Sequence, residues 1–385
     1  MEISIAQEKA EAAAGVKQFN ILGRTGWKVS DISFGGGGLK DPAIVERAVD
    51  LGMNYFDTAP DYFPASEETL GKVLPKVRDK VFITSKMCTY GKYPQHLSLH
   101  TPAEKYVECV EASLKRLQTD HVDALFVHAV GERPPTEKGE KDIERLKDPE
   151  MLKAFDALKK QGKVRFLGLS THGPHMMEEV IDYAVECGQY DLVMPTWNFM
   201  KFKDLQKALD KAKAKNVAVV AMKTVPGAKA SVPDKMAGLS PEEATVAALK
   251  WALSNPAIST IVKGAKSVAD VDLHARASGQ KLTKRDEEVL RRFASAITSS
   301  YCRTGCGECV DACPRGVAIA MVLRYNMYFE HYGHERFAME AYSQLASACT
   351  AAACAQCDAP CLRACPHGLP IREMLREAHT NLYFA

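Results

Sequence analysis

Short runs of β-branched and aromatic residues alternate with amphipathic, helix-like stretches through the first 300 residues of this 385-residue chain. Strands that alternate with helices form βαβ units and a parallel sheet. Eight such units in about 280 residues fit a closed (β/α)8 barrel, the TIM-barrel architecture. The predicted strands cover residues 32–34, 54–58, 81–86, 122–128, 164–170, 192–198, 218–224 and 259–263.

Several helix starts and one hairpin are also marked in the sequence. Asp41-Pro42 and Asp148-Pro149 each combine a capping residue with a proline at the first helical position. Residues 101–104 have the pattern of a capping box. Residues 17–22 and 27–29 flank a glycine-bounded turn, and they predict a β-hairpin that caps the floor of the barrel.

A doubly wound open sheet is the main alternative architecture. That fold carries a Gly-x-Gly-x-x-Gly turn after its first strand and an acidic residue about 20 positions later. The four glycines at residues 35–38 follow the first predicted strand, but they have neither this spacing nor the acidic partner. The sequence therefore favours the barrel.

The charge balance argues against several classes of partner. Lys and Arg number 50 against 48 Asp and Glu, which gives a net charge of +2. No basic excess points to nucleic acid or to an anionic membrane surface. The longest apolar runs, such as residues 217–222, are strand-sized and far shorter than the roughly 20 residues that span a bilayer. We therefore predict no nucleic-acid partner and no transmembrane segment. Residues 1–15 are predicted to form a flexible leader.

Cysteine is distributed very unevenly along the chain. Three of the twelve cysteines precede residue 300, and the other nine lie between Cys302 and Cys365. A disulfide framework would not leave a large N-terminal body without bridges, whereas thiols two or three residues apart can converge on one metal. We therefore divide the chain into the leader, a barrel at residues 16–297 and a cysteine-rich domain at residues 298–385.

Ionisable residues close three neighbouring strands of the predicted barrel. The second strand ends at Asp57, with Tyr62 five residues later in DTAPDY. The third strand ends at Lys86 and the fourth at His128. Active sites of such barrels lie at the C-terminal ends of the strands. The four side chains are therefore expected to face one mouth.

This pattern resembles the aldo-keto reductase superfamily, in which Asp-x4-Tyr is followed by a strand-end Lys and a strand-end His. The resemblance covers roughly residues 16–294. The segment GRTGWKVSDISFGG is similar to the opening of the family, and GLSTHGP is similar to its fifth strand. The resemblance implies a (β/α)8 barrel and an oxidoreductase that reduces or forms a carbonyl group.

Carbonyl reduction needs a hydride on carbon and a proton on oxygen, and each of these residues has a role in it. Tyr62 is the expected general acid, because a phenol with a pKa of ~10 is a weak acid near neutrality. The Lys86 ammonium would stabilise the phenolate and lower that pKa, with Asp57 holding the lysine. His128 would donate a hydrogen bond to the carbonyl oxygen and stabilise the developing alkoxide.

The resemblance also implies a nicotinamide cofactor. The family holds the carboxamide with residues after strand five and covers the ring from strand six, and the matching positions are Ser170, Thr171 and Trp197. The segment KGAKSVADVDLHA resembles the phosphate-binding segment of the family. Lys266 and Ser267 would then meet phosphates at a helix N-terminus. The positive charge of Lys266 favours NADP over NAD.

Two runs of four cysteines in the tail each end in Cys-Pro: Cys302, Cys306, Cys309 and Cys313, then Cys354, Cys357, Cys361 and Cys365. They resemble the C-x2-C-x2-C-x3-C-P run of bacterial two-cluster ferredoxins, whose fourth cysteine ligates the other cluster. Each run here has one additional residue. The resemblance implies a ferredoxin-like domain with two [4Fe-4S] clusters. Their ligands would be Cys302, Cys306, Cys309 and Cys365 for one cluster, and Cys354, Cys357, Cys361 and Cys313 for the other. Cys349 is left over, and zinc is the alternative metal because four thiolates also suit it.

Residues 317–348, between the two cysteine runs, have a helical pattern and many aromatic residues. Gly333 is expected to divide them into two helices that pack the tail against the barrel. The loops at residues 91–100 and 131–147 are expected to set substrate choice. His96 and His100 lie in the first of these loops. They are interpreted as solvated, because no third metal ligand is evident beside them.

Three functions stay open at this point. The first is NADP(H)-linked reduction or oxidation of a small carbonyl or alcohol, coupled through the clusters to one-electron transfer with a redox-protein partner. The second is an electron-transfer enzyme that needs no nicotinamide, in which the clusters pass electrons to a substrate or quinone in the barrel. Thr171 and Met194 stand where the family has its carboxamide-binding Asn and Gln, which favours this second function. The third is a redox-sensing module with structural clusters.

Clusters of this type are sensitive to oxygen when they are exposed to solvent. The sequence therefore predicts a reducing, cytoplasmic location. Export after removal of a signal that is not visible in the chain is the alternative.

Overall fold

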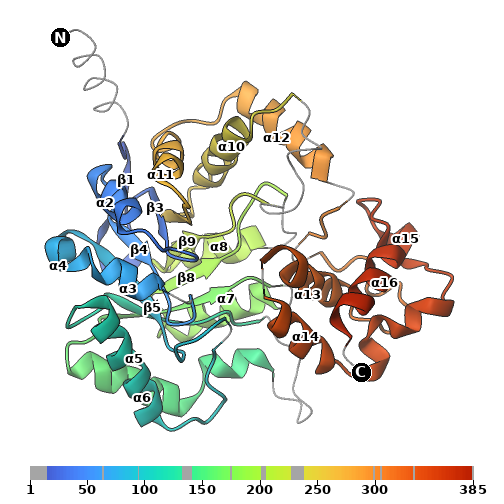
Figure 1. Cartoon of the computed structure of the whole chain (residues 1–385), viewed down its shortest axis with the longest axis horizontal. Helices are drawn as coiled ribbons and strands as arrows, with labels where there is room; N and C mark the ends of the chain where they lie inside the picture. The colour runs from blue at the N-terminus through green and yellow to red at the C-terminus, as the bar shows by residue number, and fades with distance from the viewer. Residues whose placement is uncertain are drawn as a thin grey trace.

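The structure is a computed structural model, and it describes residues 15–62, 65–93, 95–131, 141–173, 176–200, 205–226, 238–297, 300–303, 306–332 and 334–383. Almost all of the predicted leader and most of the loop at residues 131–147 lie outside the described residues. Figure 1 shows a barrel surrounded by helices, with a helical C-terminal part against one side of it.

Eight parallel strands close into a barrel, which confirms the predicted (β/α)8 architecture. The strands are β3 (Ile32–Gly35), β4 (Tyr55–Asp57), β5 (Phe82–Lys86), β6 (Ala124–Val127), β7 (Phe166–Thr171), β8 (Leu192–Pro195), β9 (Ala218–Ala221) and β10 (Thr260–Lys263). They pair in chain order, and β10 pairs with β3 to complete the ring. Each strand overlaps the run predicted for it and extends at most one residue beyond that run, although some strands end up to three residues earlier.

Helices cover the outside of the barrel (Figure 1). They are α2 (Pro42–Asp50), α3 (Ser66–Gly71), α4 (Leu74–Val77), α5 (Ala103–Leu117), α6 (Pro149–Lys160), α7 (Met177–Cys187), α8 (Leu205–Ala214), α10 (Pro241–Leu253), α11 (Val268–Ala275) and α12 (Lys284–Ile297). Asp41 and Asp148 cap α2 and α6 as predicted, and each accepts a hydrogen bond from a backbone N–H of its helix. The capping box predicted at residues 101–104 is wrong. The helix α5 starts at Ala103, whose N–H donates to the Glu150 carboxylate of α6 over 3.0 Å.

The predicted hairpin closes the N-terminal end of the barrel. Its strands β1 (Phe19–Ile21) and β2 (Lys28–Ser30) pair in antiparallel fashion. Leu22 and Val29 are fully buried, in the apolar cluster of strand residues that fills the barrel interior. The N–H of Arg24 donates to the Asn216 carbonyl, just before β9, over 2.8 Å. The opposite end, where the strands finish, is therefore the end that can hold a site.

The tail forms a helical part with its own apolar core. Its helices are α13 (Ile319–Tyr332), α14 (Glu335–Ser343), α15 (Cys361–Ala364) and α16 (Ile371–Leu382). Tyr325, Tyr342 and Leu375 are among the side chains buried in this core. The predicted division of residues 317–348 into two helices is confirmed, since α13 and α14 are separate.

The tail packs against the barrel, as the sequence predicts, and the structure places its contacts at the C-terminal ends of the strands. Arg324 of α13 donates a hydrogen bond to the carbonyl of His172, directly after β7, over 3.3 Å. Tyr93, in the loop after β5, meets Phe337 of α14 edge-on with ring centres 5.6 Å apart. The tail therefore covers part of the barrel mouth.

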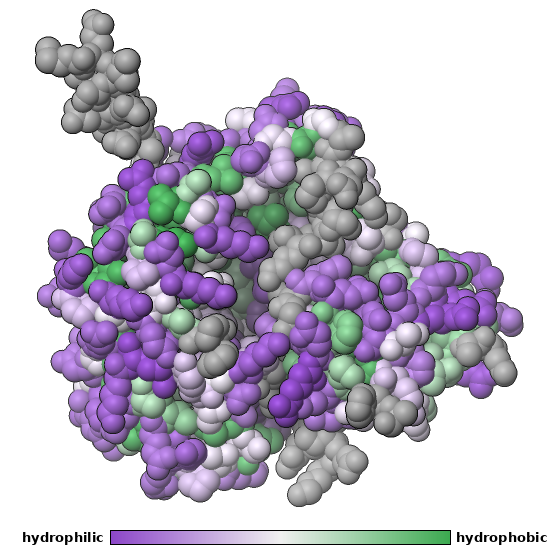
Figure 2. Space-filling view, viewed as in Figure 1, coloured by the Kyte–Doolittle hydropathy of each residue, from purple (hydrophilic) through white to green (hydrophobic). Residues whose placement is uncertain are grey.

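The visible face of the molecule is mostly hydrophilic. Figure 2 shows purple side chains over the barrel helices and over the outer end of the tail, with scattered green patches between them. None of the helices that the structure describes has the length and apolar character needed to cross a membrane.

Gly168 in β7 tests the packing beneath the barrel mouth. A Cβ at this position would overlap the buried ring of Phe126, and that ring lies 5.1 Å from the Lys86 ammonium. Gly168→Ala is expected to destabilise the protein by about 1–3 kcal/mol, the usual cost of overpacking a core. Chemical denaturation under anaerobic conditions measures the change.

Gly37→Ala is the matched control, because a Cβ there would meet no atom within 4 Å. Its stability should differ from wild type by less than about 0.5 kcal/mol. Equal stabilities for the two variants would contradict the packing described for β6 and β7.

Candidate active site

A buried ion pair joins the ends of two neighbouring strands. Asp57 is the last residue of β4, and Lys86 is the last residue of β5. The Lys86 ammonium contacts Oδ1 of Asp57 and donates a hydrogen bond to the Thr58 carbonyl over 2.9 Å. Thr84 donates a further hydrogen bond to Oδ1 of Asp57 over 2.8 Å. Both charged side chains are buried, and buried charges persist when they are paired and hydrogen-bonded in this way.

Tyr62 reaches the same ion pair from the loop after β4. Its hydroxyl lies 3.5 Å from Oδ2 of Asp57, and the Lys86 ammonium lies 5.7 Å from the centre of its ring. Burial raises the pKa of Tyr62 well above its usual value, and the carboxylates of Asp57 and Asp61 raise it further. The net shift is therefore upward, whereas the sequence analysis expects Lys86 to lower this pKa. The ammonium is held by Asp57, and the phenol faces a carboxylate and keeps its proton.

His128 follows β6 directly and completes the group. Its imidazole is buried and meets the Tyr62 ring edge-on, with ring centres 5.7 Å apart. Its carbonyl accepts a hydrogen bond from Arg145 over 2.9 Å, which holds the backbone at this strand end. The structure thus brings to one end of the barrel all four side chains that the sequence predicts there.

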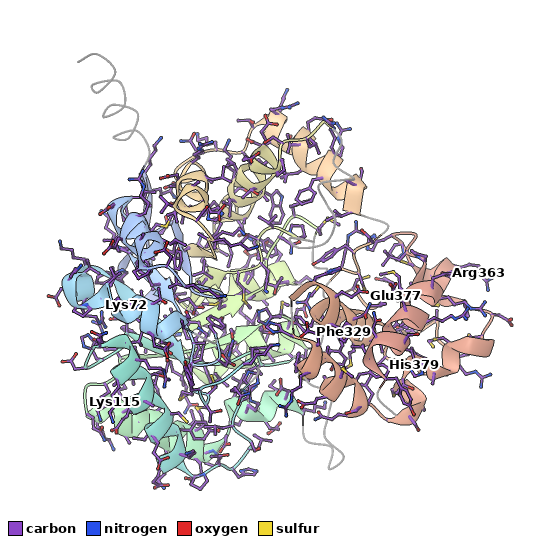
Figure 3. The ribbon with its side chains drawn as sticks, viewed as in Figure 1. Lys72, Lys115, Phe329, Arg363, Glu377 and His379 are labelled. Carbon is purple, nitrogen blue, oxygen red and sulfur yellow. The ribbon has the colours of Figure 1, made fainter. Side chains whose placement is uncertain are left out.

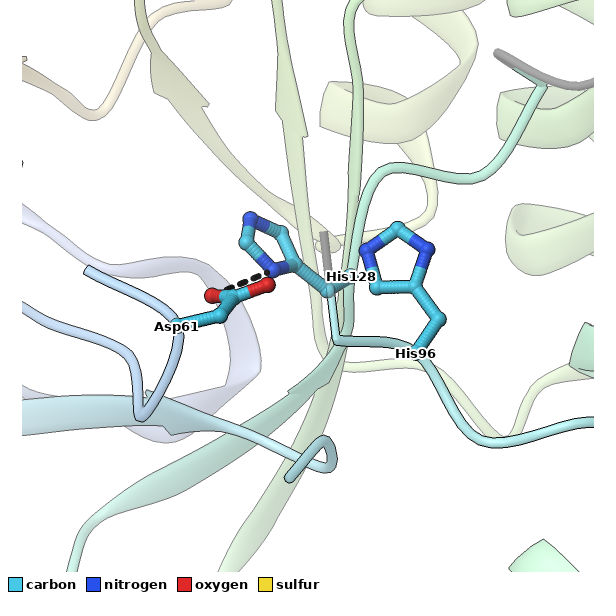
Figure 4. A group of neighbouring side chains, drawn as sticks. All are labelled: Asp61, His96 and His128. Carbon is cyan, nitrogen blue, oxygen red and sulfur yellow. Dashed lines mark ion pairs between the residues drawn. The ribbon is translucent and has the colours of Figure 1, made fainter. Parts of the chain in front are cut away.

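Two further side chains lie at this mouth that were given no role in the site from the sequence. Asp61 precedes Tyr62, and its Oδ1 lies 3.2 Å from Nδ1 of His128 (Figure 4). His96 lies on the loop after β5, with its ring centre 5.2 Å from that of His128. The interpretation of His96 as a solvated residue is therefore wrong, whereas His100 is exposed as expected. Asp61 could be found from the sequence, because it lies beside Tyr62 in DTAPDY. His96 could not, because only the tertiary structure brings it to His128.

The residues predicted to hold a nicotinamide lie at neighbouring strand ends. Ser170 and Thr171 end β7 and are buried, and the Ser170 hydroxyl accepts a hydrogen bond from the Ala129 N–H over 2.9 Å. Trp197 follows β8 and stacks on Trp251 of α10, with ring centres 5.2 Å apart and an interplanar angle of 27°. The Trp251 side chain therefore covers one face of the Trp197 indole.

The predicted phosphate site at the start of α11 is engaged by an acidic side chain. Ser267 caps this helix, as expected for a helix N-terminus. The Asp270 carboxylate accepts hydrogen bonds from the N–H groups of Lys266 and Ser267 over 2.8 and 3.1 Å. An anion bound at this helix end would share or displace these donors.

Lysines gather at this corner of the barrel. Burial lowers the pKa of Lys263 at the end of β10. Asp270 opposes this effect, and the positive charges of Lys223 and Lys266 add to it. Burial and Lys263 together lower the pKa of His274 to about 3, so that His274 is neutral. The ammonium groups of Lys223, Lys263 and Lys266 interact electrostatically, and together they create a positive potential that suits phosphate. The loops after the last two strands are a frequent phosphate site in this fold.

The tail brings cysteines of the two runs close together. Burial, together with the neighbouring thiols of Cys309, Cys306 and Cys365, raises the pKa of Cys302 to about 12. Burial and the thiols of Cys365, Cys306 and Cys361, with Cys365 the strongest of the three, raise the pKa of Cys309 to about 11. Three cysteines of the first run therefore neighbour the last cysteine of the second run.

The other group of thiols lines one cavity in the tail: Cys313, Cys354, Cys357 and Cys361. The backbone N–H groups of Val317 and Ala359 donate to Sγ of Cys313 and of Cys357, each over 3.4 Å. Sulfur atoms are visible among the helices of this part in Figure 3. Four thiols around one cavity, with N–H···S contacts, fit the ligand set of an iron–sulfur cluster.

Comparisons with known proteins agree with the barrel and its mouth. The sequence model of the aldo/keto reductase family matches residues 40–237, just over half of the chain. L-galactose dehydrogenase of Arabidopsis thaliana is 29% identical over 288 residues, which are 66% of this chain and 86% of that protein. Aldo-keto reductase YhdN of Bacillus subtilis is 33% identical over 161 residues, which are 41% of this chain and 45% of that protein.

Solved structures show the same fold. The holo form of aldo-keto reductase AKR11C1 from Bacillus halodurans has a TM-score of 0.57 and 21% identity, and it covers 75% of this chain and 99% of that chain. The family match ends before the cysteine-rich tail, and it includes the strand ends that carry Asp57, Lys86 and His128. The chain belongs to the aldo/keto reductase family of oxidoreductases.

Proposed function

We propose that this protein reduces a carbonyl group, or forms one in the reverse direction, with NADP(H) as the hydride source and Tyr62 as the general acid. The observation that carries the proposal is the gathering of Tyr62 and His128 around the buried Asp57–Lys86 pair. Relatives named L-galactose dehydrogenase and D-galacturonate reductase support a small carbonyl or alcohol as the substrate class.

The side chains of the mouth supply the proton and orient the substrate. A nicotinamide held at the mouth would supply the hydride for the carbonyl carbon. Tyr62 gives its proton to the carbonyl oxygen, so that one hydride and one proton convert the carbonyl to an alcohol. The raised pKa of Tyr62 keeps this proton on the phenol until the oxygen becomes basic. His128 donates a hydrogen bond to the same oxygen and stabilises the charge that develops there.

The neighbouring strand ends support a binding site for NADP(H). Ser170 and Thr171 would hold the carboxamide, and Trp197 would lie against the nicotinamide ring. The phosphates would lie near Lys266 and Ser267 at the start of α11, within reach of the positive charges at the ends of β9 and β10. This concentration of positive charge favours NADP, which carries the additional phosphate, over NAD.

We further propose that the tail holds two [4Fe-4S] clusters. Their ligands would be Cys302, Cys306, Cys309 and Cys365 for the first, and Cys313, Cys354, Cys357 and Cys361 for the second. The thiol neighbourhoods support both sets. Cys365 neighbours Cys302 of the first run, and Cys313 neighbours Cys354 of the second run. This exchange of the fourth cysteine is the two-cluster ferredoxin pattern, which favours iron–sulfur clusters over zinc.

The position of the tail supports electron exchange between the clusters and the barrel. Arg324 contacts the mouth through the His172 carbonyl and also acts electrostatically on Cys302. The first cluster would therefore lie near the mouth. The second would border a surface hollow lined by Cys357, Arg315 and Arg363, among others. We propose that a redox-protein partner exchanges electrons there, in a reducing, cytoplasmic setting.

A second candidate function is electron transfer without nicotinamide, in which the clusters reduce a substrate or quinone at the mouth. The observation that favours it is the Asp270 carboxylate, which already accepts the N–H groups of Lys266 and Ser267 where a phosphate would bind. In this reaction Tyr62 and His128 would still supply protons. A substrate that bleaches the reduced clusters without NADPH would favour this candidate.

Removal of the Tyr62 hydroxyl tests the proposed proton donor. Tyr62→Phe is expected to lower kcat for NADPH-dependent carbonyl reduction by roughly 10²–10⁴-fold, the usual contribution of a general acid. NADPH binding, followed by quenching of tryptophan fluorescence, should be unchanged. Tyr90→Phe is the control, because Tyr90 is 42% exposed and should keep full activity. Equal activity of Tyr62→Phe and wild type would rule out this role.

Cys365 lies in the second cysteine run but is a proposed ligand of the first cluster, and its replacement tests the proposed ligand sets. Cys365→Ser should lose the first cluster, so that anaerobically purified protein falls from about eight to about four irons. Cys349→Ser should keep all the iron, because Cys349 belongs to neither set. Iron, zinc and acid-labile sulfide analysis measures the outcome. Stoichiometric zinc with almost no iron in the wild-type protein would contradict the proposal.

A further inference from the structure

Three side chains at the barrel mouth have the composition of a metal site. Ligand atoms of Asp61, His96 and His128 lie within 4.8 Å of one another, and among the described residues they form the one such group of His, Cys, Asp and Glu. Figure 4 shows the Asp61 carboxylate beside the His128 imidazole, with His96 on the adjacent loop. Two imidazoles and one carboxylate are a common ligand set for zinc and for ferrous iron.

The Asp61 carboxylate is a buried negative charge. The residue is 2% exposed. Its Oδ2 accepts a hydrogen bond from the Gln95 N–H over 3.2 Å, and its Oδ1 lies 3.2 Å from Nδ1 of His128. The nearby Lys86 ammonium is held by Asp57 and by the Thr58 carbonyl. A buried carboxylate is stabilised by a close partner or a coordinated ion, and a cation between Asp61 and the histidines would add to these contacts.

The contact between Asp61 and His128, an ion pair when the imidazole is protonated, also has a spacing that two ligands of one ion can have. Oδ1 of Asp61 and Nδ1 of His128 are 3.2 Å apart. Both atoms are buried, and within the described part of the chain neither has a partner that meets the distance and angle limits of a hydrogen bond. Two ligands that share an ion in tetrahedral geometry, with bonds of ~2.1 Å, lie about 3.4 Å apart. The two atoms therefore have the spacing of ligands and lack the alignment of a hydrogen bond.

We propose that Asp61, His96 and His128 bind one divalent transition-metal ion, Zn²⁺ or Fe²⁺. Three protein ligands leave a coordination position for water or a substrate oxygen, as in catalytic zinc sites. An ion on Nδ1 of His128 would place the ring proton on Nε2, which is the tautomer that donates a hydrogen bond. The ion would act as a Lewis acid on the substrate oxygen at the mouth. The proposal rests on these three side chains and requires neither the nicotinamide nor the clusters.

Metal analysis of matched variants tests the site. The full chain is purified anaerobically, incubated with Zn²⁺ or Fe²⁺, separated from loosely bound metal by gel filtration and analysed by plasma mass spectrometry. Wild-type protein should retain about one equivalent more of the added metal than Asp61→Asn or His96→Asn. His100→Asn is the matched control, because His100 lies exposed in the same loop as His96. It should retain as much metal as wild type.

All of these proteins have the same tail, so metal held by its cysteines contributes equally to each and does not affect the difference in metal content between wild type and variant. Equal metal content in wild type, Asp61→Asn and His96→Asn would overturn the proposal, because any bound ion would then lie elsewhere. If Asp61→Asn fails to fold, His96→Asn decides the outcome, since His96 is only partly buried. Protein that binds the additional ion but reduces no carbonyl with NADPH would support this site and contradict the proposed function.

Discussion

The buried contact between Asp57 and Lys86 determines how the barrel mouth is organised. Each residue ends a strand, so one contact ties β4 to β5 where the backbone leaves the sheet. Removal of either partner would leave an uncompensated charge inside the barrel, at a cost of about 3–5 kcal/mol. The second oxygen of Asp57 faces the Tyr62 hydroxyl, and the ring of Phe126 lies beside the lysine. The interaction that stabilises this end of the barrel therefore also places the proposed proton donor.

The tail approaches the same end of the barrel and brings a second kind of chemistry to it. Tyr93 of the barrel packs on Phe337 of the tail, and Lys92 pairs with Glu335 at 3.5 Å. A nicotinamide transfers two electrons together as a hydride, whereas an iron–sulfur cluster transfers them one at a time. Coupling between the two therefore requires a substrate or a bound group that accepts single electrons. The mouth is where such a group would contact both parts of the chain. A redox partner at the proposed surface on the tail would then exchange electrons with the barrel through the two clusters.

Features set by local sequence could be predicted, and features set by contacts between distant segments could not. The eight strands and the ionisable residues at their ends follow from alternation that is readable within a short window. The group of Asp61, His96 and His128 could not be found in this way, because two loops and a strand end meet only in the folded chain. The raised pKa of Tyr62 depends likewise on burial and on a carboxylate placed by tertiary structure. The start of α5 shows the same limit, because Glu150 of the next helix provides the hydrogen bond that residues 101–104 were expected to provide.

The most direct measurement follows a hydrogen isotope from cofactor to product. Wild-type protein is incubated anaerobically with a carbonyl substrate and NADPH that carries deuterium at C4 of the nicotinamide, and the alcohol is analysed by mass spectrometry. If Tyr62 and His128 assist hydride transfer at the barrel mouth, the deuterium appears on the former carbonyl carbon. An alcohol whose new C–H hydrogen comes entirely from solvent would show that electrons arrive without hydride transfer, and would contradict the proposed reaction.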